Sequence, residues 1–163
     1  NKSAMLHDCA SDDSDKYTDI LDPHRRKQLE SLWPDLTSKV GDIKKHQGFW
    51  GYEFNKHGTC CKVLYNQDAY FDLAIKLKNK FDLLTTLRSQ GIIPGKTCTV
   101  KNVEDAIQAV TTKVPNLNCI GDTGGIMELL EVGVCFNREA TQVVPCRRRW
   151  KSHPNGNQQI TLP

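Results

Sequence analysis

The chain has 163 residues, a formal net charge of +3 and a hydrophobic content of 38%. A chain of this length is typical of one domain that can bury a sizeable core. Its apolar runs fall short of the roughly 18 residues that a membrane span needs, which excludes an integral membrane protein. The mild positive charge is compatible with an anionic partner, but it does not by itself identify a nucleic-acid-binding protein.

The first two thirds of the chain carry helical patterns. Asp22 followed by Pro23 predicts an N-cap and a first helical residue, and Pro34 predicts the end of that helix. Residues 35–48 are polar and are expected to form a loop. Apolar spacing and capping residues predict further helices over residues 50–61, 66–81, 82–90 and 103–114, the last capped by Asn102.

After Pro115 the pattern changes to short runs rich in β-branched residues, separated by Gly, Asn and Asp. The runs NLNCIG, IMELLEVGVCFN and TQVVPC predict strands. We therefore expect an α+β fold, with several helices packed on an antiparallel sheet, in a single domain over residues 1–163. The stretch CRRRWKSHPNGNQQ is expected to form a surface turn and tail.

Cysteine is abundant and scattered, at Cys9, Cys60, Cys61, Cys98, Cys119, Cys135 and Cys146. No C-x-x-C occurs, so the sequence supports neither a zinc ribbon nor a thioredoxin motif. The count favours a secreted, disulfide-stapled protein over a cytosolic one with free thiols. The triplet Asn1-Lys2-Ser3 is a glycosylation sequon, which agrees with secretion. Because the count is odd, at least one cysteine has no partner within the chain.

The stretch FWGYEFNKHGTCC, residues 49–61, carries a candidate catalytic trio. Glu53, Lys56 and His57 have the spacing i, i+3, i+4, which places them on one face of the predicted helix. An imidazole suits general acid–base catalysis, an ammonium can stabilise an anionic transition state, and a carboxylate can orient both, all without a metal ion. The alternative is a solvated surface trio, which is common on helices and stabilises them by only a few tenths of a kcal/mol.

The order F-W-x-x-E-x-x-K-H-G-T-C, from Phe49 to Cys60, closely resembles the second active-site segment of the T2 family of ribonucleases. The doubled Cys60-Cys61, the opening NKSAMLHDC and the later GVCFN resemble the S-ribonuclease branch, the pistil proteins of self-incompatible plants. The resemblance covers essentially the whole chain. It implies a secreted, metal- and cofactor-independent α+β endoribonuclease that cleaves single-stranded RNA by transesterification through a 2′,3′-cyclic phosphate.

The same resemblance implies roles for individual residues. His57 corresponds to the general base, and Glu53 and Lys56 to groups that assist at the transition state. Phe49 matches a position that stacks on a nucleobase; the alternative is an ordinary core aromatic. The family often has a histidine where Tyr52 stands, and we expect tyrosine there to be tolerated.

The family pattern also implies which cysteines pair. It joins Cys9 with Cys60 and Cys135 with Cys146. Cys61 and Cys98 are the leftover pair, and we expect them to join. Cys119 is expected to be free, because Ser152 stands where its usual partner would be.

The family's other catalytic histidine lies in an H-G-L-W-P segment, which the sequence lacks. We expect the chain to begin just after that segment, to lack the presumed general acid and therefore, as given, to be impaired in catalysis. Three functions remain open: an S-ribonuclease with a pollen recognition protein as a partner, a ribonuclease of defence or phosphate recovery, and a catalytically dead binding relative. A monomer is expected in each case.

The remaining candidate residues are interpreted as solvated. They are the histidines His7, His24, His46 and His153 and the arginine run at 147–149. For the arginine run, contact with RNA phosphates is the alternative.

Overall fold

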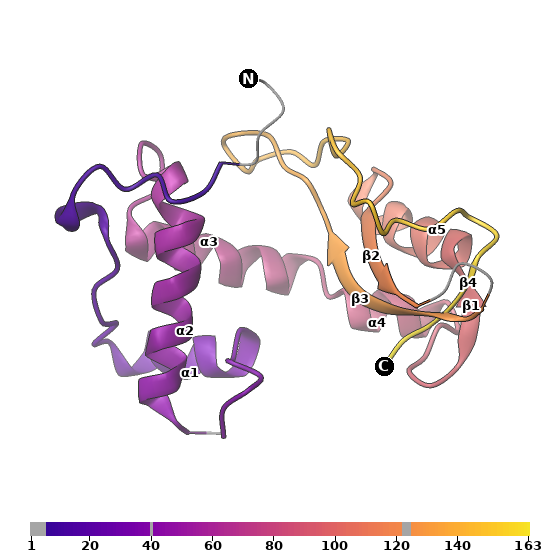
Figure 1. Ribbon diagram of the computed structural model, residues 1–163, viewed down its shortest axis with the longest axis horizontal. Coiled ribbons are helices and arrows are strands. Elements are labelled where there is room, and N and C mark those ends of the chain that lie inside the picture. Colours follow the sequence, from indigo (N-terminus) through magenta and orange to yellow (C-terminus); the bar gives the residue numbers. More distant parts are fainter. Residues whose placement is uncertain (1–5, 40, 122–124) are drawn as a thin grey trace. The chain divides into compact units, whose positions relative to one another are not determined.

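The computed structural model describes residues 6–39, 41–121 and 125–163. The chain forms two compact units, residues 1–80 and residues 81–163. The first unit is helical and the second holds the sheet (Figure 1). Together they confirm the α+β class, while a single domain over the whole chain stays a prediction.

Helices dominate the first unit. They are α1 (Pro23–Leu32), α2 (Ile43–Lys56) and α3 (Gln67–Lys80), with short 3-10 turns η1 (Asp13–Asp15) and η2 (Gly58–Cys61). The predicted start of α1 is confirmed, because the Asp22 carboxylate accepts the backbone N–H groups of His24 at 2.7 Å and Arg25 at 3.3 Å. In the described part of the chain, no helix has both the length and the apolar character needed to cross a membrane.

The core of the first unit is largely aromatic. Its buried members are Ile20, Leu29, Trp50, Phe54, Phe71 and Ile75. The ring of Tyr17 packs so closely on α2 that a Cβ at position 51 would lie 2.9 Å from it, so Gly51 is required there. The N-terminal segment is thereby packed directly against the helix that carries the candidate trio.

Helix α2 begins well before the predicted residue 50. Asp42 caps it by accepting the Lys45 N–H at 3.3 Å, and residues 43–48, expected to form a loop, are helical. The expectation is wrong because two polar residues of this stretch, His46 and Gln47, are buried and form hydrogen bonds with other segments. Their polarity therefore reflects tertiary contacts and not exposure to solvent.

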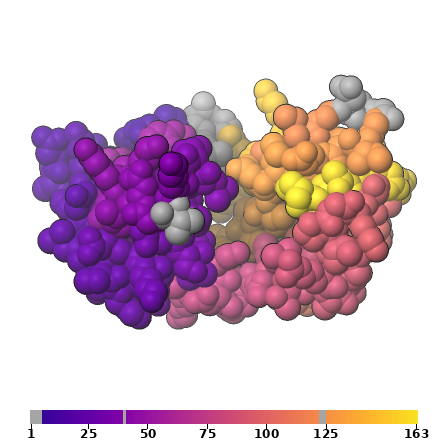
Figure 2. All heavy atoms as spheres, turned by 90° about the horizontal axis from the view of Figure 1, so that it is seen from below, coloured from indigo at the N-terminus to yellow at the C-terminus, as the bar shows by residue number. Residues whose placement is uncertain are grey.

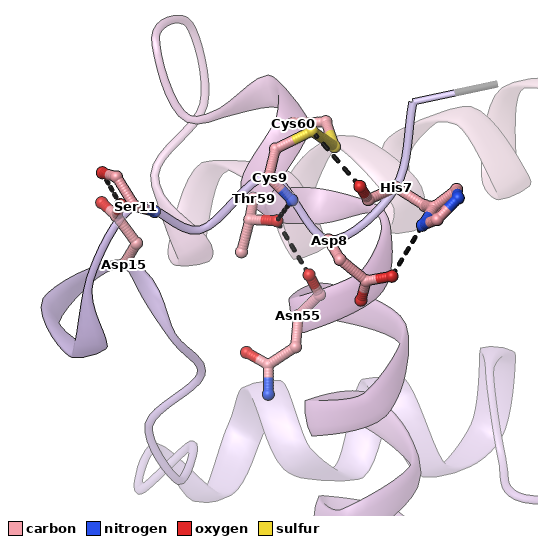
Figure 3. Close-up of a disulfide and its surroundings, with 8 residues drawn as sticks. All are labelled: His7, Asp8, Cys9, Ser11, Asp15, Asn55, Thr59 and Cys60. Atoms are coloured by element: carbon pink, nitrogen blue, oxygen red, sulfur yellow. Dashed lines mark hydrogen bonds and ion pairs between the residues drawn. A yellow bond between two sulfur atoms is a disulfide. The ribbon is translucent and has the colours of Figure 1, made fainter. Parts of the chain in front are cut away.

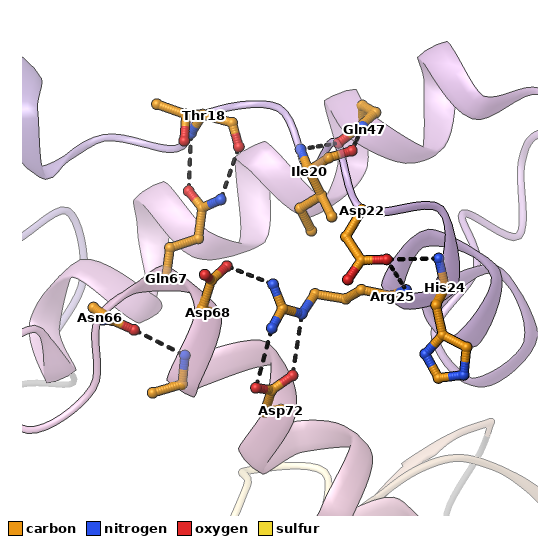
Figure 4. A network of polar contacts seen from close by, with 11 residues as sticks. Thr18, Ile20, Asp22, His24, Arg25, Gln47, Asn66, Gln67, Asp68 and Asp72 are labelled. Atoms are coloured by element: carbon orange, nitrogen blue, oxygen red, sulfur yellow. Dashed lines mark hydrogen bonds and ion pairs between the residues drawn. The ribbon is translucent and has the colours of Figure 1, made fainter.

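Two glutamines hold the N-terminal segment in the same way at different depths (Figure 4). In the core, the Gln47 amide bonds both backbone groups of Ile20, donating at 2.8 Å and accepting at 3.1 Å, and also accepts the Tyr17 hydroxyl. Burial raises the pKa of Tyr17 to about 12, so this hydroxyl stays protonated. At the surface, the Gln67 amide bonds both backbone groups of Thr18 at 2.8 and 2.9 Å.

The exchange Gln47→Leu is expected to lower the free energy of unfolding by about 2–3 kcal/mol, because it leaves buried polar groups of Ile20 without partners. The matched exchange Gln67→Leu is expected to cost less than about 1 kcal/mol, because water can replace the lost amide. Urea unfolding of both variants measures the difference. Equal losses would contradict the assignment of Gln47 as a buried anchor.

The second unit contains helices α4 (Leu83–Ser89) and α5 (Val100–Thr111) and strands β1 (Thr97–Thr99), β2 (Asn116–Ile120), β3 (Met127–Gly133) and β4 (Gln159–Thr161). The strands form one sheet in the order β1-β4-β3-β2. The pairs β1/β4 and β2/β3 are antiparallel, but β3 and β4 are parallel. The expected antiparallel sheet is therefore mixed, because the C-terminal strand inserts between β1 and β3.

The core of the second unit lies between this sheet and helices α4 and α5. Its largest fully buried members are Val100, Val103, Ile107, Leu117 and Ile160. In Figure 2 the yellow C-terminal segment lies between the orange and pink segments, in agreement with its central place in the sheet. The last strand thus completes the core as well as the sheet.

Local signals in this unit were only partly informative. Strands β2 and β3 fall in predicted runs, whereas TQVVPC forms only an isolated bridge, between Phe136 and Val143. Helix α5 begins at Val100, and its N-cap is Thr99. The predicted cap, Asn102, is the third residue of the helix and forms a capping box with Thr99.

Candidate active site

The candidate trio lies at the C-terminal end of α2, wholly within the first unit. Glu53 and Lys56 occupy its last turn. The backbone N–H of His57 donates to the Glu53 carbonyl at 2.9 Å, which extends the helical pattern by one residue. The three residues therefore follow one side of the helix end, and all three are half-buried.

The ammonium of Lys56 is held by a neighbour on the same helix. Its Nζ donates to the Tyr52 hydroxyl at 2.8 Å and lies 5.0 Å from the centre of the Tyr52 ring. The contact with Tyr52 raises the pKa of Lys56, with smaller contributions from Glu53 and Asp8. Among the described residues, no hydrogen bond or ion pair joins the side chains of Glu53, Lys56 and His57 to one another.

The carboxylate of Glu53 also acts on Tyr70 of α3. Burial raises the pKa of Tyr70 to about 12, and the negative charge of Glu53 adds to the shift. Tyr70 therefore remains a neutral phenol over the physiological pH range.

Within the described parts of the chain, no group of three or more His, Cys, Asp or Glu side chains is placed to hold a metal ion.

The glycine that follows His57 has a steric role. A Cβ at Gly58 would lie 2.3 Å from Cδ2 of Phe54, well inside van der Waals contact. The Phe54 ring is 3% exposed and belongs to the core of the first unit. Only glycine lets the chain turn from α2 into η2 directly over this ring.

A short N-terminal segment is linked to the end of α2 by a hydrogen bond and a disulfide (Figure 3). The Asp8 N–H donates to the Lys56 carbonyl at 2.8 Å. Cys9 forms a disulfide with Cys60. We call residues 8–9 with residues 56, 59 and 60 the clasp. Since these links lie on both sides of residue 57, they fix the backbone that carries the candidate general base.

Thr59 completes the clasp. Its hydroxyl is almost fully buried, accepts the Cys9 N–H at 3.1 Å and donates to the Asn55 carbonyl at 2.8 Å. The threonine of the H-G-T-C motif therefore connects the N-terminal segment to α2. The sequence shows this residue in the motif, but it gives no sign of its partners.

The predicted disulfides are confirmed for two pairs, Cys9–Cys60 and Cys135–Cys146. The third expected pair, Cys61 with Cys98, would join the two units and stays a prediction. Cys61 is exposed in the first unit, whereas Cys98 packs against the core of the second unit, where burial raises the pKa of its thiol. Cys119 is free, as expected, and it is buried.

Phe49 is half-buried on α2, one turn before Glu53. Its ring meets Trp33 edge-to-face, with centroids 6.3 Å apart and an interplanar angle of 89°. Part of the Phe49 ring is thus packed against the protein while part of its surface stays accessible. Its role in stacking on a base stays a prediction.

Two of the four histidines interpreted as solvated are buried. His46 is 2% exposed. The ring of His153 accepts the Leu117 N–H at its Nδ1, at 3.0 Å, and lies 3.1 Å from the carboxylate of Glu104. Both rings fix loops through their nitrogen atoms, which no periodic pattern indicates. His7 and His24 are exposed, as is the arginine run at 147–149; Asn1, the predicted glycosylation site, lies outside the described residues.

Comparisons with known proteins extend over nearly all of the chain. The model of the Ribonuclease T2 family matches residues 1–146. Ribonuclease S-7 of Nicotiana alata is 43% identical over 165 residues, which cover 100% of this chain and 73% of the relative. The crystal structure of the SF11-RNase associated with gametophytic self-incompatibility in Nicotiana alata matches with a TM-score of 0.84 and 33% identity, over 98% of this chain and 79% of that one. A mutant of RNase MC1 from bitter gourd, in complex with 5′-GMP, matches with a TM-score of 0.75 and 28% identity, over 97% of this chain and 78% of that one.

Proposed function

Because the chain belongs to the ribonuclease T2 family and is a ribonuclease, we propose that it cleaves single-stranded RNA by transesterification. In this reaction the ribose 2′-OH attacks the adjacent phosphorus atom. The bond from phosphorus to the 5′-oxygen of the next nucleotide breaks, and that oxygen takes a proton from water. One product then ends in a 2′,3′-cyclic phosphate and the other in a free 5′-OH. The single observation that carries the proposal is the trio Glu53, Lys56 and His57 on a helix end fixed by the clasp.

His57 is the general base in this proposal. Its ring nitrogen takes the proton of the 2′-OH while that oxygen bonds to phosphorus. The half-buried ring projects from the backbone between two fixed points, the Asp8–Lys56 hydrogen bond and the Cys9–Cys60 bridge. Such fixation supports catalysis, because the base must stay within hydrogen-bond reach of the proton that it removes.

Lys56 and Glu53 act on the charge that develops on the phosphorane-like transition state. The Lys56 ammonium can stabilise the additional negative charge on the non-bridging oxygens. Its bond to Tyr52 limits the positions that the flexible side chain can take. Glu53, one helical turn before His57, is proposed to assist the imidazole that is protonated during the reaction.

Phe49 binds a nucleobase by stacking in this proposal. Its ring is half-buried and is oriented by Trp33. Stacking on an aromatic side chain contributes roughly 1–3 kcal/mol per base and tolerates different bases. The relative that is solved with 5′-GMP supports binding of nucleotides by this fold.

A single 2′-deoxy substitution tests the transesterification. The chain extended upstream by an H-G-L-W-P segment, which supplies the family's other catalytic histidine, is expected to cleave a single-stranded RNA oligonucleotide to products that end in a 2′,3′-cyclic phosphate. The matched oligonucleotide with one 2′-deoxyribose is expected to stay intact at that linkage, because the nucleophile is missing. Mass spectrometry of the products identifies their ends, and cleavage at the deoxy position would rule out attack by the 2′-OH.

We further propose that the protein is secreted, acts as a monomer and is a pistil S-ribonuclease that a pollen protein recognises. Its 33% identity and TM-score of 0.84 with the SF11-RNase, against 28% and 0.75 with the RNase MC1 mutant, support the mating role over defence or phosphate recovery. Its two disulfides support secretion. Expression restricted to the style agrees with this role, and expression in leaf or root would contradict it.

A further inference from the structure

His46 is a buried polar residue of α2 that the proposed reaction does not use. It is 2% exposed, and its ring stacks on Trp50 with centroids 5.8 Å apart and an interplanar angle of 19°. Its Nδ1 accepts the backbone N–H of Asp35 at 3.1 Å. An imidazole that accepts at Nδ1 carries its proton on Nε2, so the hydrogen bond specifies one tautomer.

The bond to His46 is one of several that attach the chain after α1 to α2, and the Ser38 hydroxyl also lies 3.4 Å from the same Nδ1. The indole N–H of Trp50 donates to the Trp33 carbonyl at 2.8 Å. The backbone is therefore held on both sides of Pro34 by side chains from the same helix. Asp35 also organises the turn that follows, since its carboxylate accepts the Thr37 N–H at 2.9 Å and hydroxyl at 2.7 Å.

The attachment of the segment around Pro34 to α2 affects Phe49, the proposed base-stacking residue, through the ring of Trp33. Phe49 lies three residues after His46 on α2, so both are on the same side of the helix. The ring of Trp33, whose carbonyl is fixed by Trp50, meets Phe49 edge-to-face. Movement of the chain around Pro34 would therefore displace the indole that supports the Phe49 ring.

We propose that His46 is a positioning residue for nucleobase binding. Its Nδ1 fixes the backbone at Asp35, which holds Trp33 against Phe49 and keeps the Phe49 ring oriented for stacking. The residue acts through the protein and does not touch the RNA. The inference rests on the proposed function, because it needs Phe49 to bind a base.

Two variants separate the acceptor from the ring. His46→Phe keeps an aromatic ring that can stack on Trp50 but has no acceptor. His46→Asn loses the ring but places a carbonyl oxygen near the former position of Nδ1. If His46→Phe does not fold, His46→Gln replaces it, because its oxygen corresponds to Nε2 and not to Nδ1. Thermal unfolding establishes that each variant is folded at the assay temperature.

Two readouts measure base binding. The first is the Kd of the whole chain for 5′-GMP and 5′-UMP by calorimetry, which needs no turnover. The second is the division between KM and kcat for dinucleoside monophosphates. In His46→Phe we expect Kd and KM to rise about tenfold with kcat unchanged, as expected for losing one buried hydrogen bond that supports binding equally in ground and transition states. His46→Asn is expected to stay within about threefold of the wild type, because its acceptor remains.

The outcomes separate the inference from the proposed function. A folded His46→Phe protein that binds both nucleotides as tightly as the wild type overturns the positioning role. Equal weakening in His46→Asn also overturns it, because the ring and not the acceptor would then matter. Failure of the wild-type chain to cleave RNA would overturn the proposed function alone, since the nucleotide Kd values still decide the role of His46.

Discussion

Replacing His57 by alanine is expected to lower kcat for cleavage of single-stranded RNA by about 100- to 10,000-fold, the usual contribution of a positioned general base. The side chain lies at the end of α2, and its backbone N–H bond to Glu53 does not depend on the imidazole. The clasp on either side of it is also made without the ring. The loss is therefore expected in catalysis and not in folding. Initial rates on a fluorescent RNA oligonucleotide measure it.

His24→Ala is the matched control, because His24 is an exposed histidine on α1 whose hydrogen bond is made by its backbone. Its cleavage rate is expected to equal that of the wild type. Thermal unfolding of both variants should give melting temperatures within about 2 °C of the wild type, as for exposed substitutions that remove no buried contact. Equal cleavage rates for His57→Ala and His24→Ala would remove His57 from the mechanism.

Removing the Cys9–Cys60 bridge is expected to have the largest effect on stability. The two residues are 51 positions apart, and the chain-entropy model gives about 4 kcal/mol for a closed loop of this length. For a chain of this size that corresponds to a fall in melting temperature of about 8–16 °C. The double exchange Cys9→Ala with Cys60→Ala avoids creating a new free thiol at either position. Cleavage is also expected to fall at temperatures where the protein stays folded, because the clasp beside His57 is weakened.

Cys135→Ala with Cys146→Ala provides the comparison, since these residues are 11 positions apart. The same model gives about 3 kcal/mol for this shorter loop. Calorimetry of both double variants ranks the two losses. A larger loss from the shorter loop would contradict the entropic account and would indicate that local packing around each bridge dominates.

Local signals predicted the elements whose determinants lie close together in the sequence. Asp22 and Pro23 fix the start of α1 through contacts within three residues. The β-branched runs that became β2 and β3 are adjacent in the chain and pair with each other. In such cases propensity, capping and patterning all favour the same structure, so sequence alone is sufficient.

Elements that depend on distant partners were missed. Strands β1 and β4 have three residues each, too short for a period of two to be recognised, and they pair across about 60 residues of chain. The first turns of α2 were taken for a loop because His46 and Gln47 are polar. Both are buried only because Asp35 and Ile20 supply hydrogen bonds from other segments.

The candidate site was predicted as a motif but not as a set of contacts. The spacing of Glu53, Lys56 and His57 follows from the helix that carries them, so it could be inferred in advance. The bond from Lys56 to Tyr52 could not, because it depends on the rotamers of two side chains.

The burial of Thr59 bears on oxidative folding. Cys60 and Cys61 are neighbouring thiols, and either one could attack a disulfide formed at Cys9 by thiol–disulfide exchange. The Thr59 hydroxyl accepts the Cys9 N–H and so holds Cys9 beside Cys60, whereas the thiol of Cys61 stays exposed to solvent. This contact therefore favours the pairing of Cys9 with Cys60. A chain oxidised before α2 has formed lacks this selection and is expected to yield mispaired isomers.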